Sequence, residues 1–346
     1  MVNARPDRPD FPLDSEALDG SADLLTATDC STNIVQTVQT DIVDMKAVLS
    51  PKELGAAIGV SESSLKRWAD SGRLQVARTA GGHRRIDRAE AIRFVRSQGF
   101  ALERPGILGL EDIEAVSSGP DMDDPAAALY AALSNGQAER ARGLALARYV
   151  EGMPLALIID RLIAPAMRTI GDYWHHGEEG ILIEHRAADI CSQILDRVRS
   201  LSVTGPDRCT AVGGSPTDDP YVLPSLMAAS VLASEGWNEV NLSANTPPSV
   251  LARAAVESRA SLVWIAFSTE DGAERVQQVT DDLRGALTDA GLEAGIVIGG
   301  PALKAVTSIN LPGVYHARSM TELAAFAEGL RSSRAAWTAP AGNITA

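Results

Sequence analysis

The chain has 346 residues, of which 45% are hydrophobic and 4% aromatic, and its formal net charge is −14. A chain of this length accommodates two or three domains. It has no run of 18 apolar residues and no apolar N-terminal core, so the composition argues against a membrane or secreted protein, and we expect a cytoplasmic one. The cysteines, Cys30, Cys191 and Cys209, lie far apart, which argues against a disulfide framework, and we predict no metal site.

Charge is distributed unevenly along the chain. Residues 1–45 carry 2 basic and 9 acidic side chains and are rich in Pro, Asp, Ser and Thr, so we predict a disordered acidic tail. Residues 46–100 carry 11 basic and 5 acidic side chains, whereas the remainder has a net charge of −13. A single basic module in an acidic chain favours contact with nucleic acid, although a solvated basic face would carry the same charge.

Within the basic module the sequence predicts a helix-turn-helix. Ser50, Pro51 and Glu53 are typical of a capped helix start, and Ser61 caps a second helix after a tight turn at residues 59–60. Two short helices joined in this way form the DNA-binding motif, in which the second helix enters the major groove. That helix exposes Ser63, Lys66 and Arg67.

A basic hairpin is predicted directly after the second helix. Gly81 and Gly82 allow a tight turn between two short strands. Polar and basic side chains flank this turn: Arg78, Thr79, His83, Arg84 and Arg85. A wing of this kind suits contact with phosphates or with the minor groove. We expect Trp68 to pack between the second helix and the wing.

This module resembles the MerR/excisionase-type winged helix-turn-helix. The pattern V-S-x-x-[ST]-[LV]-x-R-W occupies Val60 to Trp68, and R-T-x-G-G-H-R-R occupies Arg78 to Arg85. The resemblance implies that residues 46–100 bind double-stranded DNA. A homo-oligomer, a dimer or a tetramer, is expected for reading paired half-sites. A protein-docking module that reuses the same fold is the alternative.

The rest of the chain predicts a multidomain protein of α and α/β class. Residues 101–124 have the composition of a linker, and residues 125–204 have apolar positions at helical spacing, which predicts a four-helix bundle. In residues 208–333 five short apolar runs alternate with amphipathic helices, which predicts a flavodoxin-like (Rossmann-type) doubly wound parallel sheet. Residues 334–346 form a tail. We expect a ligand pocket at the carboxyl ends of the strands, with the bundle as its lid.

Residues 125–330 resemble the cobalamin-binding region of MerR-type photoreceptor repressors and of methionine-synthase-like modules. Trp174 is followed after nine residues by Glu184-His185, and the resemblance implies that these residues cover the upper face of adenosylcobalamin. In the sheet part, Ser268 and the pair Gly299-Gly300 match positions that accommodate the nucleotide tail, where missing side chains let a ligand approach the backbone. Without the resemblance, Trp174 and His185 would be ordinary members of a helical core.

One segment departs from the family pattern. The family carries E-x-H-x-x-G after the first strand, and its His ligates cobalt from below. Here Asp219 to Pro224 occupy that loop, with Tyr221 at the His position. A protonated phenol is a poor ligand, so we predict no protein ligand below the metal. Three outcomes stay open: cobalamin without a protein lower ligand, another tetrapyrrole such as haem or a bilin, or no ligand. Tyr221 would contact the ligand or merely line the loop.

Together these features predict a DNA-binding transcription regulator that responds to a tetrapyrrole or to light. One alternative is a ligand-free regulator whose C-terminal domain serves oligomerisation or protein docking. Another is a corrinoid methyl-transfer module. We predict no enzyme and no catalytic residues, because the sequence has no Ser-His-Asp arrangement and no phosphate-binding loop.

Overall fold

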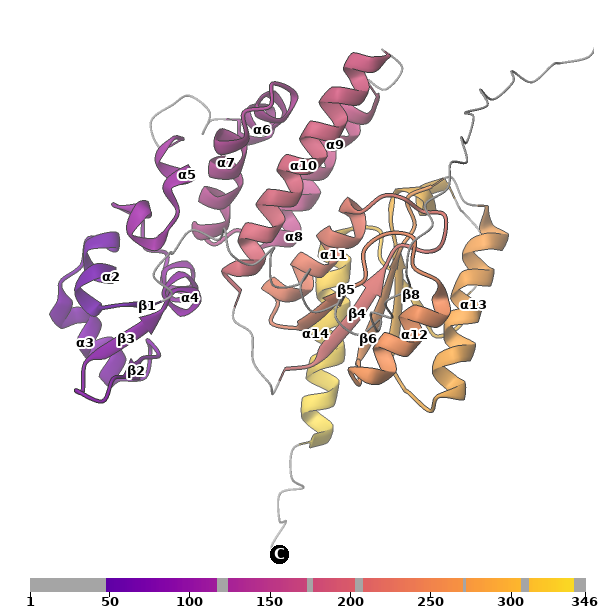
Figure 1. Cartoon of the computed structure of the whole chain (residues 1–346). Coiled ribbons are helices and arrows are strands. Elements are labelled where there is room, and N and C mark those ends of the chain that lie inside the picture. Colours follow the sequence, from indigo (N-terminus) through magenta and orange to yellow (C-terminus); the bar gives the residue numbers. More distant parts are fainter. Residues whose placement is uncertain are drawn as a thin grey trace, which may run out of the picture. The chain divides into compact units, whose positions relative to one another are not determined.

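The structure is a computed structural model that describes residues 48–116, 124–172, 177–202, 208–269, 272–305 and 311–338 (Figure 1). The predicted acidic tail lies outside these ranges, as do residues 339–346 of the predicted C-terminal tail. Residues 334–338, also part of the predicted tail, continue the last helix. Across the described ranges, none of the helices combines the length and the apolar character needed to span a membrane.

The N-terminal head, residues 48–100, runs in the order helix, tight turn, helix, β-hairpin and helix. Its elements are β1 (Val48–Leu49), α2 (Pro51–Ile58), α3 (Glu62–Asp70), β2 (Ala77–Arg78), β3 (Arg84–Asp87) and α4 (Arg88–Gln98). The predicted capping box is formed, because Glu53 N donates to Ser50 Oγ at 3.2 Å and Ser50 N donates to Glu53 Oε2 at 2.8 Å. The strands pair antiparallel in the order β1-β3-β2, so β3 connects the hairpin to the rest of the head.

Part of the predicted linker is folded, which differs from the expectation for residues 101–124. It contains η1 (Pro105–Leu108) and α5 (Glu111–Glu114). Leu108, Leu110 and Ile113 are buried here and belong to the same hydrophobic core as the buried residues of the head and of the next helices. The Arg142 guanidinium, in helix α7 (Ala138–Val150), donates to Asp112 Oδ1 at 3.0 Å and fixes α5 in place.

A helical bundle follows the folded linker. Its elements are α6 (Pro125–Ser134), α7 (Ala138–Val150), α8 (Leu155–Ile158), η3 (Ile159–Ile163), α9 (Ala164–Gly171) and α10 (Glu178–Ser200). The segments α8, η3 and α9 continue one another, and η3 is a single π-helical turn. The helices α6, α7, α9 and α10 pack around buried side chains that include Leu129, Leu144, Ile163 and Ile194.

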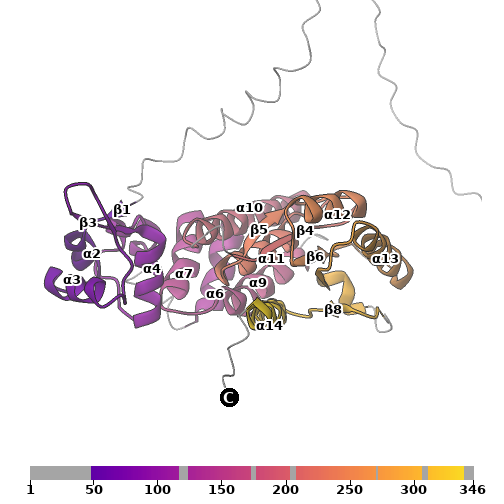
Figure 2. The same cartoon turned by 90° about the horizontal axis from the view of Figure 1, so that it is seen from below.

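The C-terminal half forms the predicted parallel sheet. Its elements are β4 (Thr210–Gly214), α11 (Leu223–Ser234), β5 (Asn238–Asn241), α12 (Pro248–Glu257), β6 (Leu262–Ala266), α13 (Ala273–Asp289), β7 (Gly295–Gly299), η5 (Pro301–Ala305), β8 (Val314–His316) and α14 (Met320–Thr338). The strand order β5-β4-β6-β7-β8 is the flavodoxin-like order, so that prediction is confirmed. The helices α12 and α13 cover one face and α11 and α14 the other (Figure 2).

Asp160 in the π-helical turn caps the last helix of the sheet half. Its Oδ1 accepts from Met320 N at 2.9 Å, and its Oδ2 accepts from Thr321 N at 2.9 Å and from Thr321 Oγ1 at 2.7 Å. The first amides of a helix have no partner within the helix, so this carboxylate satisfies two of them. The bundle and α14 are therefore joined by three hydrogen bonds to one side chain.

We expect Asp160→Ala to lower the free energy of unfolding by about 1–2 kcal/mol, the usual cost of removing a helix cap. Urea unfolding followed by circular dichroism measures this change. Asp289→Ala, at the exposed end of α13, is the matched control and should change stability by less than about 0.5 kcal/mol. Equal effects of the two substitutions would contradict a capping role for Asp160.

Candidate functional site

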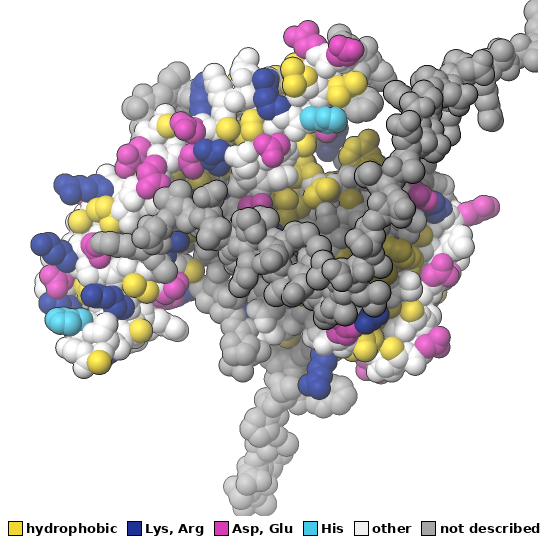
Figure 3. Space-filling view, viewed as in Figure 1, with side chains coloured by type: hydrophobic (Ala, Val, Ile, Leu, Met, Phe, Trp, Pro, Cys, Tyr) yellow, Lys and Arg dark blue, Asp and Glu magenta, His cyan; other side chains and the backbone are white. Residues whose placement is uncertain are grey.

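The exposed face of α3 carries the three side chains that the sequence assigns to DNA contact. Ser63, Lys66 and Arg67 are all exposed, while Leu65 on the opposite face is buried. Lys66 Nζ lies 2.7 Å from Glu62 Oε1, an exposed pair one helical turn apart. Such pairs are weak in water, so a phosphate can replace the carboxylate at little cost. Figure 3 shows Lys and Arg side chains spread over the surface of the head.

Trp68 packs toward α4, a contact that the sequence did not predict. Its ring packs against Phe94 of α4 and against Phe100, with centroid distances of 5.4 and 5.5 Å. Leu65 and Trp68 are three positions apart, so both lie on the face of α3 that is turned toward the core of the head. Trp68 therefore fixes the angle between α3 and the last helix of the head.

The hairpin presents Arg78, Thr79 and His83 as exposed residues. Thr79 also closes the turn, since Thr79 N donates to the His83 carbonyl at 2.9 Å and His83 N donates to Thr79 Oγ1 at 3.2 Å. Arg84 points back to α3, where its Nη2 donates to Asp70 Oδ1 at 2.5 Å. The Arg84 side chain is only 19% exposed, so its first role is to tie the wing to α3.

Arg85 is half-buried in the central strand of the head, next to Arg84. Its Nη1 donates to the Arg84 carbonyl at 3.4 Å, a long and weak hydrogen bond. The structure thus places all eight predicted DNA-contact residues on α3 and the hairpin. It exposes six of them and leaves Arg84 and Arg85 partly covered.

At the carboxyl ends of β4 and β6, the buried carboxylate of Asp219 joins two loops. Its Oδ2 accepts from Ser268 N at 2.6 Å, and its Oδ1 accepts from Tyr221 N at 3.1 Å. The sequence alone does not single out Asp219, because Ser268 lies 49 positions away and only folding brings the two together. The one signal available was the comparison with the family's loop, in which Asp219 begins the segment Asp219 to Pro224.

Ser268 presents a polar atom that the described residues leave unsatisfied. Its Oγ is buried and has no hydrogen-bond partner among them. A buried hydroxyl without a partner is costly, so this atom suits a ligand that carries a donor or an acceptor. Tyr221, two residues after Asp219, has a side chain that is exposed by 48%.

Gly299 ends β7 and Gly300 follows it, and backbone packing explains both glycines. Gly300 has φ of 115°, and a Cβ there would overlap the backbone of Phe267 at the end of β6. A Cβ on Gly299 would lie 3.0 Å from the Ala317 carbonyl oxygen. The expectation that these missing side chains make room for a ligand is therefore not needed to explain either glycine.

On the bundle side, Glu184 and His185 are neighbours on α10. His185 Nε2 lies 3.6 Å from Glu184 Oε2, and the His185 side chain is 68% exposed. Trp174, the third member of this predicted group, lies outside the described residues. Within the described part of the chain, no hydrogen bond or ion pair joins Glu184 or His185 to Tyr221 or Ser268.

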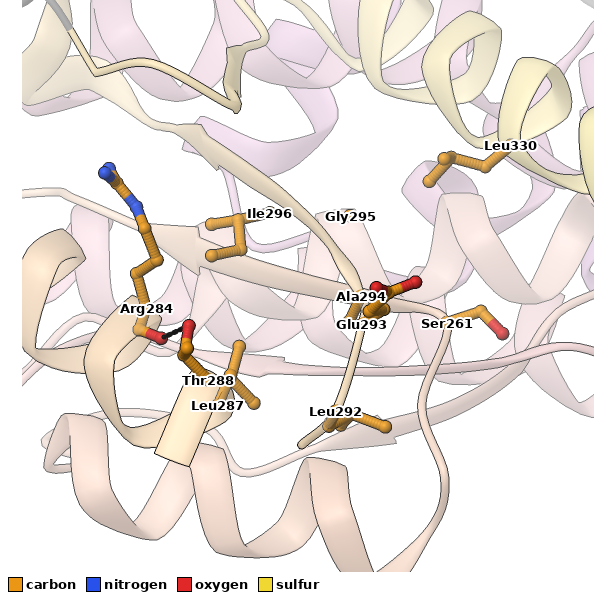
Figure 4. A pocket seen from close by; sticks show the side chains of 10 residues that line it. All are labelled: Ser261, Arg284, Leu287, Thr288, Leu292, Glu293, Ala294, Gly295, Ile296 and Leu330. Carbon is orange, nitrogen blue, oxygen red and sulfur yellow. Dashed lines mark hydrogen bonds between the residues drawn. The ribbon is translucent and has the colours of Figure 1, made fainter. Parts of the chain in front are cut away.

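Neither of the two cavities that we describe lies at this edge of the sheet. The larger, about 360 Å³, is at the amino ends of β6 and β7, where Ser261, Arg284 and Gly295 line it (Figure 4). The smaller, about 230 Å³, is an apolar groove between α6 and α9. In the ranges that the structure covers, no group of three or more His, Cys, Asp or Glu side chains is placed to hold a metal ion. Burial raises the pKa of the Cys191 thiol to about 12, so it is no thiolate at neutral pH.

The residues at the strand ends fit a cobalamin only in part. The buried Ser268 Oγ has no hydrogen-bond partner among the described residues, so it is available to a bound ligand. The donor set offers no protein ligand below cobalt, because the resemblance implies a histidine at the position of Tyr221 and a protonated phenol binds metals poorly. A corrin ring would therefore be held here by contacts to its edges and faces, without a bond from the protein to the metal.

Comparison with known proteins finds similarity in the bundle and along most of the chain. Residues 126–199 match the family model of the B12 binding domain. Over 281 residues, the chain is 23% identical to the HTH-type transcriptional repressor CarA of Myxococcus xanthus, and the match covers 80% of this chain and 95% of that protein. These two findings confirm the resemblance to cobalamin-binding-like regulators that the sequence predicts.

Solved structures of corrinoid proteins are also similar. The monomethylamine corrinoid protein of Methanosarcina barkeri is 17% identical, with a TM-score of 0.43 and coverage of 58% of this chain and 96% of that one. A cobalamin-binding protein of Desulfitobacterium hafniense is 15% identical, with a TM-score of 0.29 and coverage of 60% and 96%.

Proposed function

We propose that this protein regulates transcription by binding double-stranded DNA through its head, under the control of a ligand held by the bundle and the sheet. The observation that carries the proposal is the exposed polar and basic face of α3 beside a hairpin that Arg84 ties to it through Asp70. A helix with an attached wing suits the major groove and the flanking backbone. The similarity to a helix-turn-helix repressor over most of the chain supports the same function.

The proposed ligand is a tetrapyrrole of the cobalamin class at the carboxyl ends of β4 and β6. The match of residues 126–199 to the B12 binding domain and the unsatisfied Ser268 Oγ support this class. When bound, such a group supplies absorption of visible light, and a light-sensitive bond where its upper ligand is an alkyl group. Glu184 and His185 would contact its upper face, and Tyr221 and Ser268 its lower side. The protein would act without catalysing a reaction.

Ligand binding would act on the DNA-binding surface through the contacts between the head and the bundle. The Arg96 guanidinium of α4 lies 3.5 Å above the centroid of the Tyr149 ring in α7, and it also donates to the Tyr149 carbonyl. Burial raises the pKa of Tyr149, which keeps the phenol neutral. Because α4 directly follows β3 of the wing, a shift of α7 would move the hairpin as well. We expect this shift to accompany a change in homo-oligomeric state, between monomer and dimer or tetramer.

Binding of the full-length chain to a labelled random-sequence duplex tests the DNA part. We expect affinity to fall steeply with salt, by roughly 0.9 log units per log unit of salt for each phosphate contacted. Because the chain as a whole has a net charge of −14, such binding has to come from a local basic surface. No binding at low ionic strength would overturn the proposal.

Absorption spectra test the ligand part. Full-length protein is mixed with a cobalamin, with haemin or with biliverdin, freed of excess ligand, and measured in darkness and after illumination. If the protein keeps a visible absorption band of one of these ligands after the excess is removed, the proposed ligand class is supported. A featureless protein under every condition, together with salt-dependent DNA binding, would favour the alternative of a ligand-free regulator.

A further inference from the structure

Trp264 of β6 is one of two tryptophans in the core between the sheet and helices α11 and α14. This tryptophan is 2% exposed. Its ring lies over Gly213 of the neighbouring strand β4, where a Cβ would overlap the ring, so the two residues fit only because Gly213 has no side chain. Trp264 thus fills the space over Gly213 beside β4.

Hydrogen bonds hold the ring in that position. Trp264 Nε1 donates to Ser225 Oγ at 3.0 Å, and Ser225 Oγ donates to Asn241 Oδ1 at 2.8 Å. Ser225 lies in the first turn of α11 and is completely buried. Every member of this chain of polar groups is satisfied, so moving the indole would leave the Ser225 hydroxyl without its donor. The ring is therefore fixed by packing on one side and by hydrogen bonding on the other.

The layer that contains Trp264 lies next to the loop of Tyr221, and this limits where the nucleotide arm of a bound cobalamin can be placed. Tyr221 lies in the loop that joins β4 to α11, two residues before α11 begins, and Trp264 contacts both of these elements. A cobalamin carries a nucleotide arm whose own base binds cobalt from below unless a protein ligand replaces it. A displaced arm has to be buried in a slot or left in water, and the slot next to this loop contains Trp264.

We infer that the site takes a corrin ring with its nucleotide arm outside the protein, still bound to its own cobalt or absent altogether. The inference rests on the proposed ligand class. Two independent features carry it, since Tyr221 supplies no ligand that would displace the arm and Trp264 leaves no slot that would receive it. The ligand is then recognised by its ring and side groups, with Ser268 Oγ among the contacts.

Equilibrium binding of two probes to the full-length protein tests the inference. The probes are hydroxocobalamin and cobinamide, which has the same ring but lacks the nucleotide base. We expect dissociation constants within about threefold of each other, because an arm in solvent contributes little binding energy. Bound cobalamin should keep the absorption spectrum of the form whose own base is on cobalt. A base-off spectrum, or cobinamide binding more than about tenfold weaker, would overturn the inference. Failure of both probes to bind would instead remove the proposed ligand class, and the inference with it.

Two variants make the roles of Tyr221 and Trp264 separable. Tyr221→His offers an imidazole while Trp264 still fills the layer, and we expect the bound cobalamin to keep its own base on cobalt. Tyr221→His combined with Trp264→Ala opens the slot, and we expect a base-off spectrum and a preference of at least about tenfold for cobalamin over cobinamide. Trp264→Leu in the same background controls for folding, which circular dichroism monitors. A base-off spectrum in the single Tyr221→His variant would show that the layer admits the arm despite Trp264.

Discussion

Replacing Lys66 and Arg67 together by alanine is expected to weaken binding to double-stranded DNA by roughly 10- to 100-fold at about 0.1 M salt. Both side chains are exposed on the face of α3 that we place in the major groove. Neither contributes to the core of the head, which is built on the opposite face from Leu65 and Trp68. The loss should therefore appear in affinity and not in stability. The slope of log affinity against log salt concentration should also become shallower, by roughly 0.9 for each phosphate contact that is lost.

Fluorescence anisotropy with a labelled duplex across a range of salt concentrations measures both quantities. Arg253→Ala is a matched control, because Arg253 forms an exposed pair with Glu257 one turn along α12, as Lys66 does with Glu62. This control should bind DNA like the unaltered chain. If the control weakened binding as much as the double substitution, the contact surface would not be on α3.

Gly300→Ala is expected to lower the free energy of unfolding by about 3–5 kcal/mol, the range of the most damaging single substitutions. Gly300 has φ of 115°, a conformation that a residue with a side chain adopts only under strain. An added Cβ would also overlap the backbone of Phe267, which cannot turn aside as a side chain can. Because Phe267 N donates to the Gly299 carbonyl at 2.8 Å, the ends of β6 and β7 would have to separate. Ser268 and its bond to Asp219 would move with them.

Urea unfolding of the Gly300→Ala variant and of the unaltered protein measures the difference in their free energies of unfolding. Gly285→Ala is the contrasting control, since Gly285 lies in α13 with open space around its Cα and no unusual φ. Alanine is favoured over glycine within a helix, so this variant should be more stable by roughly 0.5–1 kcal/mol. A Gly300→Ala protein as stable as the unaltered one would mean that Phe267 does not approach Gly300 as closely as the structure shows.

The amino-acid sequence by itself determined the local elements. The capping box of Ser50 and Glu53 and the turn before Ser61 involve residues within a few positions of one another, and such signals act over short distances. The alternation of apolar strands and amphipathic helices was enough for the parallel sheet and its strand order. The sequence did not reveal that residues 105–114 are folded, because their glycines, proline and acidic residues resemble a linker until α7 is present to cover Ile113.

The tertiary structure decided which side chains are available and which are already engaged. Arg84 looks like any wing arginine in the sequence, and only folding brings it to Asp70, 14 positions away. Asp219 acquires its role from the amide of Ser268, and Gly300 from the backbone of Phe267. The physical reason is the same in each case: these partners are distant along the chain, so their contacts depend on how the layers pack, which no short pattern of residues encodes.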